Sequence, residues 1–145
     1  MKIVAQIVKD AKLYIDDSLY SEIPYGLLLL VSFKVGDTKE DALLMADKVL
    51  KMRIFPDESQ KTNLNISDIN GEILSVSQFT IYGEFKGRRP SFTNVLPGAQ
   101  SKELYDIFNK ALNEVITVKT GVFGAMMNIS FTNVGPVTYI LEENA

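Results

Sequence analysis

The sequence contains no cysteine and no histidine, and both absences limit the chemistry open to it. Without cysteine the chain has no disulfide, no thiolate nucleophile and no thiolate ligand for a metal ion. Without histidine it lacks the commonest general base and the commonest metal ligand of proteins. A Ser-His-Asp or Cys-His catalytic centre is therefore excluded. We expect no metal and no cofactor, and any catalysis must use hydroxyls, carboxylates, lysine, backbone N–H groups or a group of the substrate.

Long apolar runs and a strong charge of one sign are also missing. The longest apolar run, Leu27–Val31, is far shorter than the about 20 residues that span a bilayer. The first ten residues are interrupted by Gln6 and lack a small-residue cleavage site, so they indicate a first strand rather than a signal peptide. A net charge of −3 argues against broad adhesion to nucleic acid but leaves room for a local basic patch. We expect a cytoplasmic protein that binds neither membrane nor DNA.

The length and composition are those of one globular domain. The chain has 145 residues, of which 46% are hydrophobic and 23% charged, and this is enough for a real core. It shows no repeat, low-complexity tract or linker. We therefore expect a single domain over residues 1–145.

The N-terminal part is patterned as strands. Residues 2–8 alternate between two faces in the manner of a strand. Asp16-Asp17 indicates a turn before a second short strand that ends near Ile23. Pro24-Tyr25-Gly26 is a further turn signal. The apolar run from Gly26 to Phe33 then predicts a strand covered on both faces.

Two later segments have the apolar spacing of amphipathic helices. The first opens with Asp37 or Thr38 as its cap and should end near Arg53. Its buried stripe consists of Ala42, Met45, Ala46, Val49 and Leu50. The second is expected to be capped by Ser101. Its apolar face consists of Leu104, Phe108, Ala111, Leu112 and Val115.

The remaining segments complete an α/β pattern. Residues 57–71 are polar and indicate an irregular connection or a hairpin, and Gly121–Gly124 a tight connection. Residues 126–132 and 137–142 are predicted as two strands on either side of a turn at Asn133–Pro136. The order predicts two amphipathic helices on one side of a mixed sheet. The surplus of strand makes a second strand layer or a partly closed barrel plausible.

The stretch Glu72–Gly83 begins as a buried strand and ends in polar residues. Ile73, Val76 and Ile81 suit a core strand. Ser77, Gln78 and Thr80 carry polar atoms that need partners when buried, which indicates a site. The alternative is a half-exposed strand with its polar face in water. The basic cluster that follows, Lys86, Arg88 and Arg89, is either part of that site or a solvated loop.

Two motifs resemble the signatures of the D-aminoacyl-tRNA deacylase family. They are Ser77-Gln78-Phe79-Thr80 and Asn133-Val134-Gly135-Pro136-Val137-Thr138. Met52–Phe55, Lys86–Phe92 and Gly121–Ala125 stand between them in the family's order, and the resemblance covers Met1 to Leu141. It implies a homodimer of a three-layer α/β/β fold. Its activity would be cleavage of the ester between a D-amino acid, or mischarged glycine, and the 3′ end of tRNA.

The resemblance also implies roles for these residues. Ser77 and Gln78 would hold the ribose and the ester, and N–H groups around Phe79 and Thr80 would stabilise the oxyanion. The free ribose hydroxyl beside the ester would orient or activate the attacking water. The resemblance also implies a cis bond at Gly135-Pro136, inserted into the partner's site to exclude L side chains, although the sequence alone indicates only a turn. This filter comprises Gly135, Pro136, Val137 and Thr138.

Two more groups follow from the same resemblance. Lys86, Arg88 and Arg89 would contact phosphates near the acceptor end of tRNA. Phosphate contacts do not depend on base sequence, so they suit an enzyme that accepts many tRNAs. Phe123, Ala125 and Met127 fall where the family lines its adenosine pocket, and their alternative is ordinary core.

The chain departs from the family at three positions. Ile7 stands where an arginine that helps to lock the Gly-Pro motif is usual. Val134 replaces a usual Asp, and Met126 stands where Asp or Tyr is common. The intact Ser-Gln-Phe-Thr and Gly-Pro-Val-Thr motifs keep the chain with the chirally strict group rather than with a sister group of relaxed chirality.

Two other functions compete with the deacylase. The first is a non-catalytic module that binds the tRNA end or a nucleotide. The second is a small-ester hydrolase with Thr80 as its nucleophile. No histidine can activate Thr80 and no other base is identifiable nearby in the sequence, so a binding or structural hydroxyl is favoured.

Overall fold

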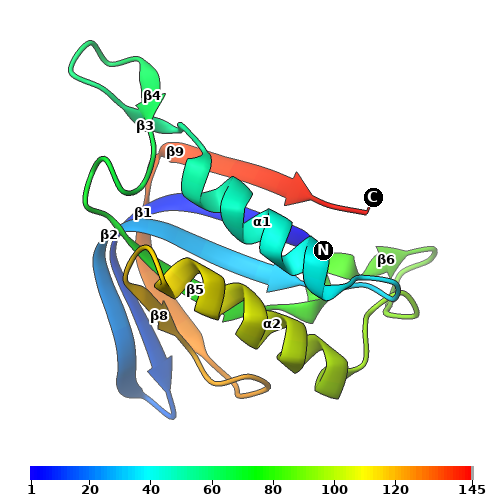
Figure 1. The fold of residues 1–145 in the computed structure, drawn as a ribbon. Helices are drawn as coiled ribbons and strands as arrows, with labels where there is room; N and C mark the ends of the chain where they lie inside the picture. Colours follow the sequence, from blue (N-terminus) through cyan, green and yellow to red (C-terminus); the bar gives the residue numbers. More distant parts are fainter. Residues whose placement is uncertain (145) are drawn as a thin grey trace.

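A computed structural model describes residues 1–144 and shows two helices packed on one face of a mixed sheet (Figure 1). The sheet has the order β8-β5-β2-β1-β9. β1 is antiparallel to β2 and β9, whereas β5 is parallel to β2 and β8. The strands are β1 (Lys2–Ile15), β2 (Ser18–Ser32), β5 (Glu72–Ser77), β8 (Val118–Thr120) and β9 (Asn128–Glu142). The α/β class, the mixed sheet and its two covering helices are confirmed.

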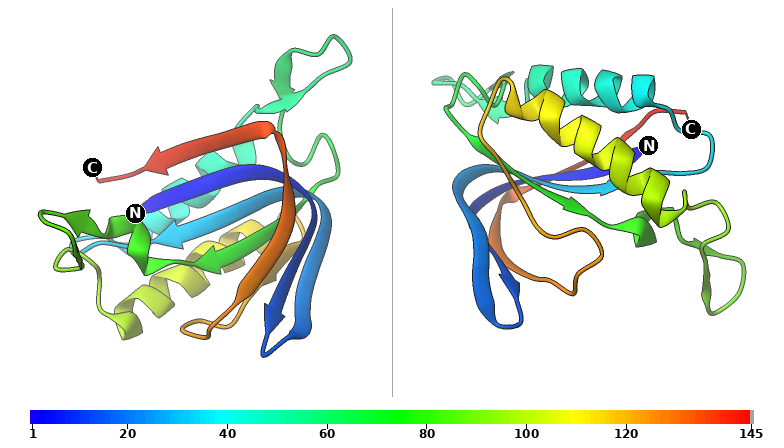
Figure 2. Two further views of the ribbon diagram at one scale, coloured as in Figure 1. Left: turned by 180° about the vertical axis from the view of Figure 1, so that it is seen from behind. Right: turned by 60° about the horizontal axis from the view of Figure 1, so that its bottom comes forward.

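Both faces of the sheet bury apolar side chains. Because side chains alternate along a strand, Ile3, Ala5 and Ile7 of β1 join the core beneath the helices. Val8 and Leu13 join a second cluster with Leu28 and Leu74 on the other face. The C-terminal half of β1 and the N-terminal halves of β2 and β9, which pair with it, bend away from the helices (Figure 2). The bent halves remain part of the same five-stranded sheet.

The turn predicted at Asp16-Asp17 is present, and both residues have the positive φ that tight hairpin turns favour. The turn predicted at Pro24–Gly26 is wrong, because β2 runs straight through it. The pairing skips from Lys9↔Tyr25 to Ala11↔Ile23. Pro24 donates no N–H, so it interrupts one rung of the ladder without ending the strand.

Gly26 is required by the neighbouring strand. Its φ is +152°, and a Cβ at this position would overlap the backbone carbonyl oxygen of Glu72. Gly26 and Glu72 are also the first pair of the parallel β2–β5 ladder. The glycine that indicated a turn therefore permits a close approach between two strands.

The helices α1 (Lys39–Lys51) and α2 (Gly98–Asn113) bury the faces expected of them. Thr38 caps α1, with Asp41 completing a capping box. The cap predicted for α2 is wrong: the helix begins at Gly98, and the Ser101 hydroxyl lies inside it and donates to the Leu96 carbonyl at 2.8 Å. Val115 lies beyond α2 and is exposed, so it does not belong to the apolar face.

Two of the longer connections contain short hairpins. β3 (Phe55–Pro56) and β4 (Thr62–Leu64) form one of them, which was one of the two forms expected for residues 57–71. After β5 the chain enters the 3₁₀ helix η1 (Phe79–Tyr82), so Ile81 is not a strand residue. β6 (Glu84–Phe85) and β7 (Pro90–Ser91) form a hairpin with the basic cluster at its tip.

The two strands predicted near the C-terminus are one strand. β9 continues through Asn133–Pro136 and pairs with β1 on both sides of it. Thr138 lies opposite Gln6, and Asn133 lies opposite Val8. Four residues of β9 therefore face the single residue Ile7, which makes a bulge rather than a turn.

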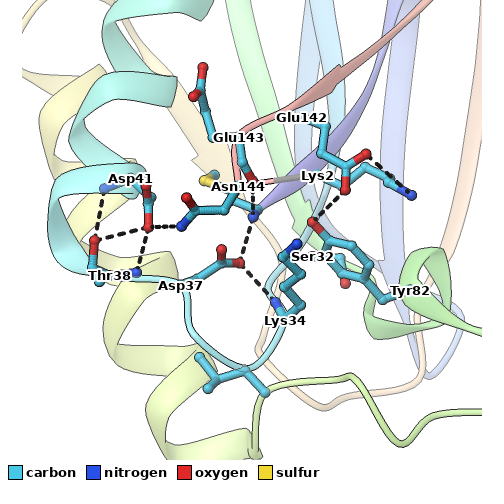
Figure 3. A network of polar contacts seen from close by, with 12 residues as sticks. Lys2, Ser32, Lys34, Asp37, Thr38, Asp41, Tyr82, Glu142, Glu143 and Asn144 are labelled. Atoms are coloured by element: carbon cyan, nitrogen blue, oxygen red, sulfur yellow. Dashed lines mark hydrogen bonds and ion pairs between the residues drawn. The ribbon is translucent and has the colours of Figure 1, made fainter.

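The C-terminal end of β9 is tied to the helix layer (Figure 3). The N-terminal ammonium of Met1 lies 2.5 Å from the Asp37 carboxylate and donates to the Glu143 carbonyl at 2.9 Å. Burial lowers the pKa of this ammonium, and its hydrogen bond with Asp37 opposes that shift. Nearby, Asn144 donates to the Asp41 carboxylate of the capping box at 2.6 Å. These contacts join the start of β1 and the end of β9 to the start of α1.

Within residues 1–144, no helix is both long and apolar enough to cross a membrane.

Candidate active site

A cavity of about 620 Å³ opens where the sheet loses a strand. β8 pairs with β5 only as far as Ser75↔Thr120. Beyond that point Val76 and Ser77 have no strand on this side, and both line the cavity. The other walls come from the end of β2, η1, the segment before α2 and the start of that helix, and the segment that joins β8 to β9.

The cavity gathers residues from two predicted groups. Ser77, Gln78 and Phe79 line it at the end of β5. On the other side it is lined by the three residues expected in the adenosine pocket: Phe123, Ala125 and Met127. The segments meet because Tyr105 of α2 lies between them, with its ring 6.0 Å from Phe123 and its hydroxyl donating to the Ser75 carbonyl at 2.7 Å.

Thr80 does not line the cavity but is bonded to Gln78, which does. Its hydroxyl donates to the Gln78 amide oxygen at 2.7 Å, and its backbone N–H points to the same oxygen at 3.4 Å. An amide oxygen is not a base, so this contact does not activate the hydroxyl as a nucleophile. It fixes the Gln78 amide oxygen and leaves the NH₂ group of Gln78 for a ligand.

Backbone and aromatic contacts hold η1 at the cavity. The Gln78 N–H donates to the Val31 carbonyl at 2.8 Å, which extends the β2–β5 ladder by one bond. The buried Ser32 hydroxyl lies 3.4 Å from the Phe79 carbonyl oxygen. The Phe79 ring packs edge-on against Phe92 at 5.1 Å. The first residue of the turn, Phe79, has no acceptor for its N–H within the turn.

No Asp, Glu, Lys or Arg lines the cavity, so its polar groups are hydroxyls, one side-chain amide and backbone. The nearby Tyr105 is buried, which raises the pKa of its hydroxyl. Tyr82 at the end of η1 has a raised pKa because of burial and the Glu142 carboxylate. Neither phenol is suited to act as a base near neutral pH. Residues 1–144 contain no group of three or more carboxylates able to hold a metal ion.

The second motif does not line the cavity of its own chain. Gly135 and Pro136 are exposed in the bulge of β9, at one edge of the sheet, and are joined by a cis peptide bond. Gly135 has a φ of +113°, and a Cβ there would lie 2.5 Å from the Val137 side chain. Val137 is half-buried on the core, whereas Thr138 is exposed.

The basic cluster also stands apart from the cavity lining. Lys86, Arg88 and Arg89 are all exposed on the β6–β7 hairpin. The Lys86 ammonium lies 3.7 Å from the Glu84 carboxylate. Within residues 1–144 neither arginine forms an ion pair, so both guanidinium groups can meet an anion.

The structure adds lining residues that sequence reasoning assigned no role here. Phe92 packs on Phe79, and its place in the Lys86–Phe92 block was the available signal. Ser101 lines the cavity from inside α2 rather than capping the helix. Met126 lines the rim and is 89% exposed, a value that only the loop geometry reveals.

The comparisons with known proteins agree with this architecture. The family profile described as D-Tyr-tRNA(Tyr) deacylase matches residues 4–142. The D-aminoacyl-tRNA deacylase of Anoxybacillus flavithermus is 49% identical over 144 residues, which cover 98% of this chain and 99% of that protein. That of Listeria monocytogenes is 46% identical over 146 residues, covering 99% and 97%.

Solved structures show the same fold. The structure of the c-Myc DNA Unwinding Element Binding Protein superposes with a TM-score of 0.95 at 36% identity and covers 100% of both chains. A probable eukaryotic D-amino acid tRNA deacylase superposes with a TM-score of 0.86 at 18% identity, covers 97% of both chains and supports the fold alone. By the match of its sequence over residues 4–142, the chain belongs to the D-Tyr-tRNA(Tyr) deacylase family.

Proposed function

We propose that the chain hydrolyses the ester bond of D-aminoacyl-tRNA and releases the free D-amino acid and tRNA. Relatives over nearly the whole chain carry this activity in their names. The observation that carries the proposal here is one cavity lined by both Ser77-Gln78-Phe79 and Phe123-Ala125-Met127. The first set offers hydroxyl, amide and N–H groups to a ribose and an ester, and the second offers apolar contacts to a base.

Water activation is assigned to the substrate. The cavity lining holds no carboxylate, lysine or histidine that could serve as a general base. The free hydroxyl of the terminal ribose lies beside the ester and can orient the attacking water. An aminoacyl ester is already activated, so positioning and oxyanion stabilisation supply the remaining help. The Phe79 N–H, which opens η1, is the donor best suited to the oxyanion.

Selectivity against L-aminoacyl esters is assigned to a second copy of the chain. Gly135 and Pro136 lie exposed on the edge strand and do not line the cavity of their own chain, which supports their action at the site of another copy. β9 also exposes Phe131, Tyr139 and Ile140, apolar side chains that a partner would cover. A filter made of backbone is indifferent to side-chain identity, which suits an enzyme for many D-amino acids. Glycine has no side chain to exclude, so the proposal includes mischarged Gly-tRNA.

Binding of the tRNA acceptor end is assigned to the β6–β7 hairpin. Arg88 and Arg89 lack ion-pair partners within residues 1–144, and phosphate contacts from exposed arginines are independent of sequence. The net charge of −3 confines such attraction to this local patch. Because charged tRNA is made and used in translation, the proposal places the enzyme in the cytoplasm.

The test is an ester-release assay on three substrates. The protein is incubated with D-Tyr-tRNA, L-Tyr-tRNA and Gly-tRNA, and the remaining ester is followed in each. Release of D-Tyr and Gly with L-Tyr retained is expected. Absence of D-Tyr release would remove the enzyme proposal, and tight binding of the tRNA end without release would select a binding module.

A further inference from the structure

A side chain, rather than β1–β9 backbone pairing, bridges the base of the β9 bulge, where the chain leaves the ladder after Asn133 and rejoins it at Thr138. Outside the bulge, β1 and β9 pair at Gln6↔Thr138 and at Val8↔Asn133. Between these pairs Ile7 faces the four residues 134–137, so the strand leaves the carbonyl of Ile7 without its usual backbone donor. A buried or half-buried carbonyl needs a replacement donor.

The replacement donor is the carboxamide of Asn133. Its NH₂ group donates to the Ile7 carbonyl at 3.1 Å and to the Val137 carbonyl at 3.0 Å. One bond reaches the neighbouring strand, and the other spans the two ends of the bulge. Both protons of the amide are therefore used to set the distance between the point where the chain leaves β9 and the point where it returns.

Two further side chains hold the amide in this orientation. The Asn133 amide oxygen lies 3.4 Å from the Gln6 amide nitrogen and 3.4 Å from the Thr138 hydroxyl. The Gln6 amide nitrogen also donates to the Thr138 hydroxyl oxygen at 3.3 Å. These contacts are long, so they steer the carboxamide rather than hold it strongly. The amide oxygen, which cannot donate, therefore faces these two donors while the NH₂ group faces the two carbonyls.

The underside of the bulge is apolar. Val134 and Val137 flank Gly135-Pro136 and pack against the core cluster that contains Ile7. Ile7 itself is 2% exposed, so its side chain faces the core rather than the bulge tip. Gly135-Pro136 is thus supported by the packing of Val134 and Val137 on the core. It is also supported by the hydrogen bonds of the Asn133 carboxamide at the base of the bulge.

We propose that Asn133 is a positioning residue that fixes Gly135-Pro136 in the orientation needed to exclude L-aminoacyl esters. This inference rests on the proposed function, because the tip must be a filter for its position to affect chirality. Packing by Val134 and Val137 and the ladder pairs on either side keep the bulge folded. The two bonds of the Asn133 carboxamide add a direct link across the base of the bulge. Loosening them lets the tip retreat when an L side chain enters.

The test uses two variants and an achiral substrate. Asn133→Asp keeps the size and the acceptor oxygen but replaces the donor by a carboxylate facing two carbonyls, and Asn133→Ala removes the tie without adding a charge. In both, the ratio of kcat/KM for D-Tyr-tRNA to that for L-Tyr-tRNA should fall by about tenfold or more, as expected for the loss of two hydrogen bonds. Gly-tRNA, which needs no filter, should keep its kcat/KM within about threefold.

Asn113→Asp is the matched control. The Asn113 amide oxygen accepts from the Val118 N–H at 3.2 Å, and a carboxylate preserves that acceptor. Its D-to-L ratio should equal that of the wild type. An unchanged ratio in either folded Asn133 variant overturns the inference, and so does an equal loss for Gly-tRNA, which would make Asn133 merely structural. A wild-type protein that fails to release D-Tyr defeats the proposed function instead, so the two failures are distinguishable.

Discussion

At the residue scale, the contact between Gln78 and Thr80 accounts for the role of the threonine hydroxyl. The Thr80 hydroxyl is 2.7 Å from the Gln78 amide oxygen, and Thr80 lies outside the cavity that Gln78 lines. A threonine nucleophile needs a base and a path to the substrate, and the geometry gives it neither. Its hydroxyl instead holds the Gln78 amide, the group that the proposed function assigns to the ester.

Replacement of Thr80 separates these roles. Thr80→Val keeps the shape and removes the hydroxyl, so kcat/KM for D-Tyr-tRNA should fall by about tenfold through a less ordered Gln78. Thr80→Ser keeps the donor and should stay close to the wild type. The check is steady-state deacylation of the two variants side by side. A loss of several orders of magnitude with Thr80→Val, together with a covalent acyl-enzyme in the wild type, would restore the nucleophile.

The sequence pointed to candidate site residues but did not predict their contacts. Resemblance to family motifs pointed to Ser77 and Gln78, because these chemical groups stand in a recognisable order. It did not indicate that Phe92 would pack on Phe79 at 5.1 Å, or that Ser101 would face the cavity. Both depend on where the β6–β7 hairpin and α2 settle, which no local pattern encodes.

At the element scale, local signals succeeded where the structure is local. The capping box of Thr38 and Asp41 is written within four consecutive residues, and α1 starts where they predict. Pro24 and Gly135-Pro136 carry equally clear turn signals, yet both lie inside long strands. At both places the pairing with β1 keeps the segment in a strand. The proline is accommodated by one missing pair in β2 and by a bulge in β9.

The close approach of β2 and β5 at Gly26 yields a stability prediction. Gly26→Ala should lower the free energy of unfolding by about 3 kcal/mol, because the new Cβ would meet the backbone of Glu72 at a positive φ. Gly98→Ala is the control, since at the start of α2 a Cβ would have no neighbour within 4 Å. It should leave stability unchanged or raise it by up to about 1 kcal/mol. Urea unfolding of the three proteins measures both; equal midpoints would contradict the close approach.

At the scale of the whole molecule, the architecture separates the two motifs of one chain. The cavity is lined from β2, the end of β5, the start of α2 and the segment that joins β8 to β9, whereas the Gly135-Pro136 bulge lies on the edge strand β9 and does not line it. The composition and the alternation of helices and strands were sufficient to predict the class of fold. They could not show this separation, because the order of strands in a sheet is set by pairings between distant segments.

A subunit-mixing experiment tests whether the motifs act across copies. Gln78→Ala should weaken hydrolysis but keep an intact filter, and Gly135→Ala should distort the filter, since its Cβ would lie 2.5 Å from the Val137 side chain. Excess Gln78→Ala protein added to the Gly135→Ala protein should restore rejection of L-Tyr-tRNA at the functional cavities. If the hydrolysis of L-Tyr-tRNA does not respond to mixing after subunit exchange, the filter does not act in trans.

The central claim is that D-aminoacyl esters are hydrolysed in the cavity lined by Ser77 and Gln78, while the backbone at Gly135-Pro136 excludes L-aminoacyl esters. The most direct measurement is the rate of ester loss from D-Tyr-tRNA and L-Tyr-tRNA in one reaction with limiting enzyme. The account predicts that the D ester disappears while the L ester decays no faster than it does without protein. Loss of both esters at equal rates, or of neither, would contradict it.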